Sequence, residues 1–119
     1  MSEAILVVDD DPQLRQLMRW ALEDGGFQVE TAADGRDALD RIAQAPPRVV
    51  VLDVTLPGPD GFAVADALRA RGAERVPIVM ITADGSAAEK AARMRAFAYL
   101  RKPFDMAALI AAIHQALGR

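Results

Sequence analysis

Residues 5–12 read ILVVDDDP, an apolar run that passes directly into three adjacent carboxylates. The β-branched run Ile5–Val8 is typical of a strand that is covered on both faces, as in a parallel sheet. Beyond Pro12 the apolar residues recur at the spacing of one helical face. They are Leu14, Leu17, Met18, Ala21 and Leu22. With Asp11 as the N-cap, Pro12 at the first helical position and glycines at 25 and 26, the stretch predicts a strand followed by a helix.

The same alternation continues to the end of the chain. Further strands are expected at residues 27–31, 49–52, 77–82 and 98–101. The first of these alternates weakly and suggests an edge strand. Helices are expected after residues 34 and 61, at residues 86–97 and at residues 105–117, with Asp34 and Asp105 as N-caps and Gly72 ending the third. Five strand–helix units in strict alternation predict an α/β fold with a parallel sheet and helices on both faces.

The composition narrows the class of protein. The 119 residues contain no cysteine and no linker rich in Gly, Ser or Pro, so we expect one domain over residues 1–119 without disulfides or thiolate chemistry. The net charge of −3 and the scattered basic residues argue against direct nucleic-acid binding. No apolar run approaches the roughly 18 residues of a membrane span. We therefore expect a cytoplasmic protein without membrane attachment.

Polar residues gather at the carboxyl ends of the expected strands. Asp9 and Asp10 follow the first strand, and Asp53 closes the third. Thr82 ends the fourth strand, and Lys102 follows the fifth. These ends share one edge of a parallel sheet, where open α/β sheets bind their ligands. In a doubly wound sheet with strand order 2-1-3-4-5, the crevice between the first and third strands brings the three aspartates together.

Three carboxylates in one crevice repel one another unless a cation lies among them. Oxygen ligands without cysteine favour Mg²⁺, with Mn²⁺ as the alternative. Because Mg²⁺ often completes its shell with phosphate oxygens, a phosphoryl group is the expected companion. Lys102 and Thr82 supply a positive charge and a hydroxyl suited to positioning phosphoryl oxygens. With no serine or cysteine in the crevice, a carboxylate is the expected nucleophile and an acyl phosphate the expected product.

Four segments of the chain resemble one family. They read ILVVDDDP at 5–12, VVVLDVTLPGPDGF at 49–62, PIVMITA at 77–83 and YLRKPF at 99–104. In this order and at about these spacings they are similar to the receiver domains of response regulators in two-component signalling, of the single-domain, chemotaxis-regulator type. The resemblance covers essentially the whole chain and implies a flavodoxin-like (βα)5 fold. It implies a phosphorylation-activated signalling domain that assists only its own phosphorylation and dephosphorylation and is not otherwise an enzyme.

The resemblance also implies roles for the residues in the crevice. Asp53 is similar to the phosphoacceptor, which receives its phosphoryl group from a sensor histidine kinase or a histidine phosphotransfer protein. Asp10 corresponds to the direct Mg²⁺ ligand and Asp9 to a ligand that binds through water. Asp53 and the backbone carbonyl of Thr55 complete the protein's share. Lys102 corresponds to the residue that pairs with a phosphoryl oxygen, and the Lys102–Pro103 peptide bond is expected to be cis.

For the switch, the resemblance implies that Thr82 moves to bond the phosphoryl group and that Tyr99 rotates inward into the space it leaves. The fourth helix, the fifth strand and the fifth helix would then present an altered surface to a partner protein. Thr55 and Asp84 occupy the two positions that tune the lifetime of the phosphoryl group in the family.

The chain departs from the family pattern between Thr82 and Lys102. This segment is about two residues shorter than usual, and residues 95–98 read RAFA where Gly-Ala-Asp is customary. A pseudo-receiver that binds partners without phosphorylation therefore remains an alternative. A Mg²⁺-dependent phosphatase with an aspartyl-phosphate intermediate is a further alternative. Its second acid would stand two residues after the nucleophile, where this chain has Thr55. Trp20 lies off the apolar face of the first helix and is either a half-exposed packing residue or an anchor for a partner.

Overall fold

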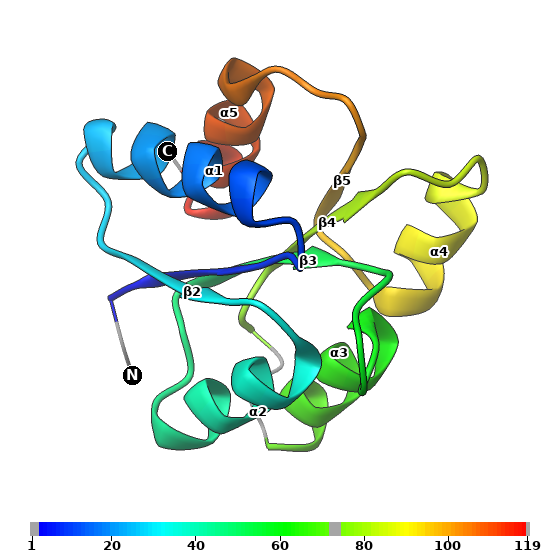
Figure 1. Ribbon diagram of the computed structural model, residues 1–119. Coiled ribbons are helices and arrows are strands. Elements are labelled where there is room, and N and C mark those ends of the chain that lie inside the picture. Colours follow the sequence, from blue (N-terminus) through cyan, green and yellow to red (C-terminus); the bar gives the residue numbers. More distant parts are fainter. Residues whose placement is uncertain (1–2, 72–74, 119) are drawn as a thin grey trace.

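The computed structural model describes residues 3–71 and 75–118. Within these ranges five parallel strands form one sheet in the order β2-β1-β3-β4-β5, with helices on both faces (Figure 1). The strands are β1 (Ile5–Val8), β2 (Val29–Ala32), β3 (Val49–Asp53), β4 (Ile78–Thr82) and β5 (Ala98–Arg101). The helices are α1 (Pro12–Asp24), α2 (Gly35–Gln44), α3 (Gly61–Ala70), α4 (Ala87–Met94) and α5 (Met106–Ala116). The doubly wound flavodoxin-like fold and its strand order are confirmed.

The burial of each strand follows from its place in the sheet. Every residue of β1, β3 and β4 is buried, because these strands lie between other strands and under helices on both faces. In β5 exposed residues alternate with partly buried ones, and in β2 Glu30 is exposed, Val29 and Thr31 are partly buried and only Ala32 is buried; these two strands lie at the edges. The weak alternation at residues 27–31 therefore marked an edge strand, although the strand itself lies at Val29–Ala32.

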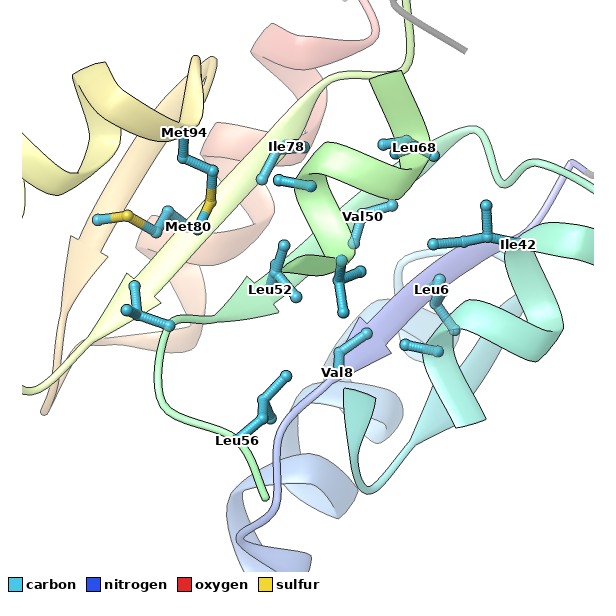
Figure 2. Close-up of a cluster of buried hydrophobic side chains, with 14 of the residues drawn as sticks. Leu6, Val8, Ile42, Val50, Leu52, Leu56, Leu68, Ile78, Met80 and Met94 are labelled. Atoms are coloured by element: carbon cyan, nitrogen blue, oxygen red, sulfur yellow. The ribbon is translucent and has the colours of Figure 1, made fainter. Parts of the chain in front are cut away.

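Two clusters of buried apolar side chains lie on opposite faces of the sheet. On one face, Leu6, Val50 and Leu52 pack against side chains from α2, α3 and α4 (Figure 2). On the other face, Val49 and Val51 pack against side chains from α1 and α5. Neighbouring residues of β3 thus enter different clusters, as the twofold period of a strand requires. Figure 1 shows α1 and α5 together on one side of the sheet and α2 and α3 on the other.

The caps expected from the sequence form at two helices and fail at a third. The Asp11 carboxylate accepts the backbone N–H of Gln13 at 3.0 Å, and the Asp34 carboxylate accepts that of Asp37 at 2.8 Å. Asp105 precedes α5 as expected, but its side chain makes no capping hydrogen bond. Its backbone oxygen instead accepts the N–H groups of Ala108 and Leu109. The expectation for Asp105 was therefore right about position and wrong about its carboxylate.

Two other expectations need correction. The side chain of Leu17 is 51% exposed, although its spacing placed it on the buried face of α1. The fourth helix ends at Met94 and not at residue 97, because Arg95 adopts a left-handed conformation with φ of 57°. The expected stop at Gly72 lies outside the described residues. Among the described helices, none is long and apolar enough to cross a membrane.

Candidate functional site

The carboxyl ends of β1 and β3 lie side by side at one edge of the sheet. Val8 pairs with Leu52 in the parallel register, so the residues that follow them, Asp9 after the end of β1 and Asp53 at the end of β3, are neighbours. The start of α3 lies against the same edge, since the Gly61 N–H bonds the Val54 carbonyl at 2.9 Å. A Cβ atom at position 61 would stand 2.4 Å from the backbone oxygen of Asp53. Only glycine permits this approach, which fixes the backbone that carries Asp53.

Three carboxylates converge at this edge. Asp9, Asp10 and Asp53 each offer an oxygen, and these oxygens lie within 4.8 Å of one another. Asp9 is fully buried and Asp53 is 4% exposed, whereas Asp10 faces solvent. Backbone donors orient the two buried side chains: the Asp11 N–H bonds Asp9 Oδ1 at 2.9 Å, and the Thr55 N–H bonds Asp53 Oδ1 at 3.2 Å.

Lys102 brings the only side-chain cation that touches these buried carboxylates in the described part of the chain. Its Nζ donates to Asp53 Oδ2 at 2.9 Å and lies 3.1 Å from Asp9 Oδ2. The approach to Asp9 is an ion pair without the geometry of a hydrogen bond. Asp9 Oδ2, which is buried, therefore has no hydrogen-bond partner. The Lys102–Pro103 peptide bond is cis, as the resemblance implies.

The charges of the site are not balanced. Burial raises the pKa of Asp53 above its ordinary value, the hydrogen bond from Lys102 opposes this, and the charge of Asp9 adds to it. Burial lowers the pKa of Lys102, but its contacts with Asp53 and Asp9 together outweigh burial and raise that pKa. One ammonium group thus contacts two carboxylates of a cluster that contains three.

These residues fit a small divalent cation. The donors are carboxylate oxygens, and one of them, Asp9 Oδ2, is buried without a hydrogen bond. A hard cation that prefers oxygen ligands would satisfy this atom and offset the surplus negative charge. The cluster therefore has the composition of a Mg²⁺ site.

The remaining predicted residues differ in burial and in their contacts. Thr82, at the end of β4, is 1% exposed, and its Oγ1 accepts the Asp84 N–H at 3.1 Å. The Asp84 side chain forms an ion pair with Lys90 of α4. Thr55 is exposed beside Asp53. Tyr99 is 42% exposed on β5, so the structure does not bring its ring to the carboxylates.

Some residues at the site were not predicted. Arg15, in the first turn of α1, donates to the backbone oxygen of Asp9 at 2.8 Å. Lys90 contacts Asp84 six residues away, a spacing that is not one of the helical side-chain spacings. Arg101 donates to the Gly85 carbonyl at 3.3 Å across the strand end. The signal for Arg15 was present, since it is the only cation in that turn, whereas the contacts of Lys90 and Arg101 depend on loop geometry.

Comparison with known proteins identifies this arrangement. A family model described as the response regulator receiver domain matches residues 5–114. The chain belongs to the response regulator receiver family. This receiver domain is 45% identical to the response regulator MprA of Mycolicibacterium vanbaalenii, and the match covers the whole of the chain and 52% of that protein. It is 44% identical to the MprA of Mycobacterium tuberculosis, again over the whole chain and 52% of the relative.

Solved structures agree. The chemotaxis protein CheY4 of Vibrio cholerae superposes with a TM-score of 0.87 at 34% identity, over 98% of this chain and 99% of that one. The receiver domain of NtrX from Brucella abortus superposes with a TM-score of 0.87 at 37% identity, over 96% and 98% of the two chains. The receiver domain thus resembles both a chemotaxis protein and a domain of a larger regulator. It spans about half the length of the curated relatives that it matches.

Proposed function

We propose that this receiver domain accepts a phosphoryl group on the Asp53 carboxylate from the phosphohistidine of a sensor kinase or phosphotransfer protein, in a Mg²⁺-dependent reaction. The observation that carries the proposal is the position of Asp53, buried among Asp9, Asp10 and Lys102. An Asp53 oxygen forms the new bond to phosphorus as the phosphorus–nitrogen bond of the phosphohistidine breaks. The electron pair of that bond stays with the imidazole.

Each neighbour of Asp53 has a distinct part in this proposal. Asp10, Asp9, Asp53 and the Thr55 carbonyl would hold Mg²⁺, which neutralises the charge that develops on the transferred group. Lys102, already 2.9 Å from Asp53, pairs with a phosphoryl oxygen. Thr55 and Asp84 border the site and set how readily water reaches the acyl phosphate.

The switch follows from the charge that phosphorylation adds. A phosphoryl group brings roughly two negative charges and three acceptor oxygens. We expect the Thr82 hydroxyl to turn toward it and the exposed Tyr99 ring to rotate inward, which changes the surface formed by α4, β5 and α5. A partner protein reads this surface, and the chain acts by partner binding or by relay of the phosphoryl group in the cytoplasm, without contact to nucleic acid or membrane.

An apolar surface beside the site supports approach of the phosphodonor protein from the side of α1. Leu17 and Trp20 are 51% and 60% exposed. Leu17 also lines a groove of about 390 Å³ that Lys102, Pro103 and Met106 line as well. A helix docked along this groove would bring a phosphohistidine near the Lys102 end of the site, and the exposed Trp20 would serve as an anchor.

Mass measurement of the intact chain tests the proposal. With acetyl phosphate and Mg²⁺ we expect one phosphoryl adduct, which chelation of Mg²⁺ prevents and which is absent from Asp53→Ala. An adduct that survives in Asp53→Ala would refute the assignment of Asp53. Complete lack of an adduct would favour the pseudo-receiver.

A matched pair of aspartates tests the metal ligands. Asp10→Ala removes a member of the carboxylate cluster, and we expect it to abolish Mg²⁺-dependent phosphorylation. Asp11→Asn changes the adjacent residue but keeps an oxygen that can cap α1, so we expect it to retain nearly full phosphorylation. Equal losses in both variants would contradict this division of roles. Multiple turnover of a phosphomonoester would favour the phosphatase, although Thr55 stands where its second acid is required.

A further inference from the structure

The loop of residues 83–86, which joins β4 to α4, holds the hydroxyl of Thr82. The Asp84 N–H donates to Thr82 Oγ1 at 3.1 Å. Within the described residues this hydroxyl accepts a bond from its own loop, and no hydrogen bond joins it to the Asp53 carboxylate. Thr82 is 1% exposed. We expect its hydroxyl to reach a phosphoryl group on Asp53 only if the loop changes its position or the side chain turns within it.

Two cations from different elements hold this loop. Lys90 of α4 donates to Asp84 Oδ2 in an ion pair. Arg101 of β5 donates to the Gly85 carbonyl at 3.3 Å. The two contacts fix consecutive residues of the loop, one through a side chain and one through the backbone. Arg101 is also the residue directly before Lys102, so the same strand end carries a site residue and a loop contact.

We propose that Lys90 and Arg101 are positioning residues that clamp residues 83–86 in the arrangement of the unphosphorylated protein. This rests on the proposed function, because the clamp opposes the movement of Thr82 toward a phosphoryl group on Asp53. The clamp does not touch the reacting atoms. It acts on the equilibrium between the two arrangements of the loop, so its loss favours the arrangement that binds the phosphoryl group.

Linkage gives the direction of the effect. A ligand that binds one arrangement better binds more tightly once the competing arrangement is weakened. Lys90→Met and Arg101→Met should each tighten binding of a phosphoryl mimic by about 2- to 4-fold, because exposed polar contacts of this kind are individually weak. The variant with both substitutions should tighten it by roughly 4- to 16-fold, if the two effects add.

The first experiment needs no phosphoryl group. Amide hydrogen exchange of Asp84 and Gly85, followed by NMR without Mg²⁺ or phosphodonor, should be faster in Lys90→Met and Arg101→Met than in the wild type. Arg19→Met is the matched control, because it removes an exposed ion pair of α1, that with Glu23, and should leave exchange in the loop unchanged. Unchanged exchange at Asp84 in both clamp variants would overturn the proposal.

The second experiment measures binding of beryllium fluoride with Mg²⁺, a mimic of a phosphoryl group on a carboxylate. Tighter binding by the clamp variants supports the proposal, and equal or weaker binding overturns it. Thr82→Val should abolish the gain, because the hydroxyl that the clamp restrains is then absent. A residue that only stabilised the fold would weaken binding when removed and would not depend on Thr82.

A cycle with Asp84 separates the ion pair from other effects of Lys90. Asp84→Asn should tighten binding about as much as Lys90→Met, and the double variant should show no further gain. Additive gains would overturn the role of this pair. A wild-type chain that takes up no phosphoryl group would refute the proposed function, and the exchange of Asp84 would then decide the clamp by itself.

Discussion

The environment of Asp53 disfavours the ionised form of its carboxyl group. Its pKa is raised mainly by burial, since burial and the charge of Asp9 together exceed the opposing effects of Lys102 and of the Thr55 N–H. A carboxyl group with a higher pKa in the folded than in the unfolded protein contributes stability below its unfolded pKa. That contribution is lost as the pH rises through its folded pKa. At neutral pH the ionised side chain therefore costs stability, which a bound cation would restore.

Removal of this charge should stabilise the protein. We expect Asp53→Asn to raise the Tm at pH 7 without divalent cations by roughly 2–5 °C, because the amide keeps an acceptor for the Thr55 N–H without the charge. Thermal unfolding followed by circular dichroism at pH 7 and about pH 4 measures this. The gap should shrink at the lower pH, where the wild-type carboxyl is increasingly protonated. A lower Tm for Asp53→Asn at pH 7 would contradict the inferred charge balance.

The sequence predicts those residues of the site whose position follows from the ends of the strands. Asp9, Asp53 and Lys102 come together because parallel strands place their carboxyl ends at one edge, and this follows from pattern and topology. Burial could not be predicted, since nothing in the sequence distinguishes the buried Asp9 from the exposed Asp10. The contacts of Lys90 depend on the path of a loop, which periodicity does not describe.

At the scale of the element, the face of α1 turned toward solvent is more apolar than its packing requires. Leu22 is fully buried and Leu17 is 51% exposed, although both fit the same helical stripe. The stripe is wider than the area that the sheet and α5 cover. We relate the excess to the groove beside Lys102 and not to the core.

Truncation of these two leucines should separate core from surface. Leu22→Ala should lower the free energy of unfolding by about 2–5 kcal/mol, because it leaves a cavity in a packed core. Leu17→Ala should change it by less than about 1 kcal/mol. Urea unfolding at equilibrium measures both, and a comparable loss at position 17 would show that its side chain is part of the core.

The end of α4 requires a strained backbone conformation. Arg95 takes a left-handed conformation with φ of 57°, which side chains with a Cβ atom adopt reluctantly. Its carbonyl accepts a hydrogen bond from Arg69 at 3.1 Å, so the conformation is tied to a contact with α3. Neither glycine nor proline marks this end, and for that reason the expected helix ran three residues too far.

Glycine at position 95 should relieve the strain. We expect Arg95→Gly to raise the free energy of unfolding by about 0.5–1 kcal/mol, because glycine adopts this conformation freely and keeps the carbonyl that Arg69 contacts. Arg93→Gly, inside the last turn of the same helix, should instead lower it by about 1 kcal/mol. Chemical unfolding of both variants checks the signs, and a loss at position 95 would refute the assignment of strain.

At the scale of the whole molecule, one sheet separates two cores that share its strands. Val50 and Leu52 serve one core, and Val49 and Val51 serve the other. Neither core can be exposed without disturbing β3. We therefore expect the chain to unfold in a single cooperative transition.

Mg²⁺ should shift this transition as a whole. A cation that binds only the folded state adds about 2.7 kcal/mol at a free concentration 100 times its Kd. We expect Mg²⁺ to raise the urea midpoint with an unchanged slope and EDTA to reverse the effect. Asp10→Asn should respond much less. A change in slope, or an equal response in Asp10→Asn, would show that Mg²⁺ acts elsewhere.

The close contact of Gly61 with the backbone of Asp53 makes one side of the carboxylate site rigid, whereas the other side is free to move. The end of β3 and the start of α3 touch with no room for a methyl group, so neither shifts alone. Thr82 and Lys102 lie on the other side, at the ends of β4 and of the edge strand β5. If Asp53 is phosphorylated as proposed, we expect the structural change to spread across the sheet toward β5, because the side formed by β3 and α3 is closely packed. The absence of a side chain at Gly61 would set this direction as much as the charged residues of the site do.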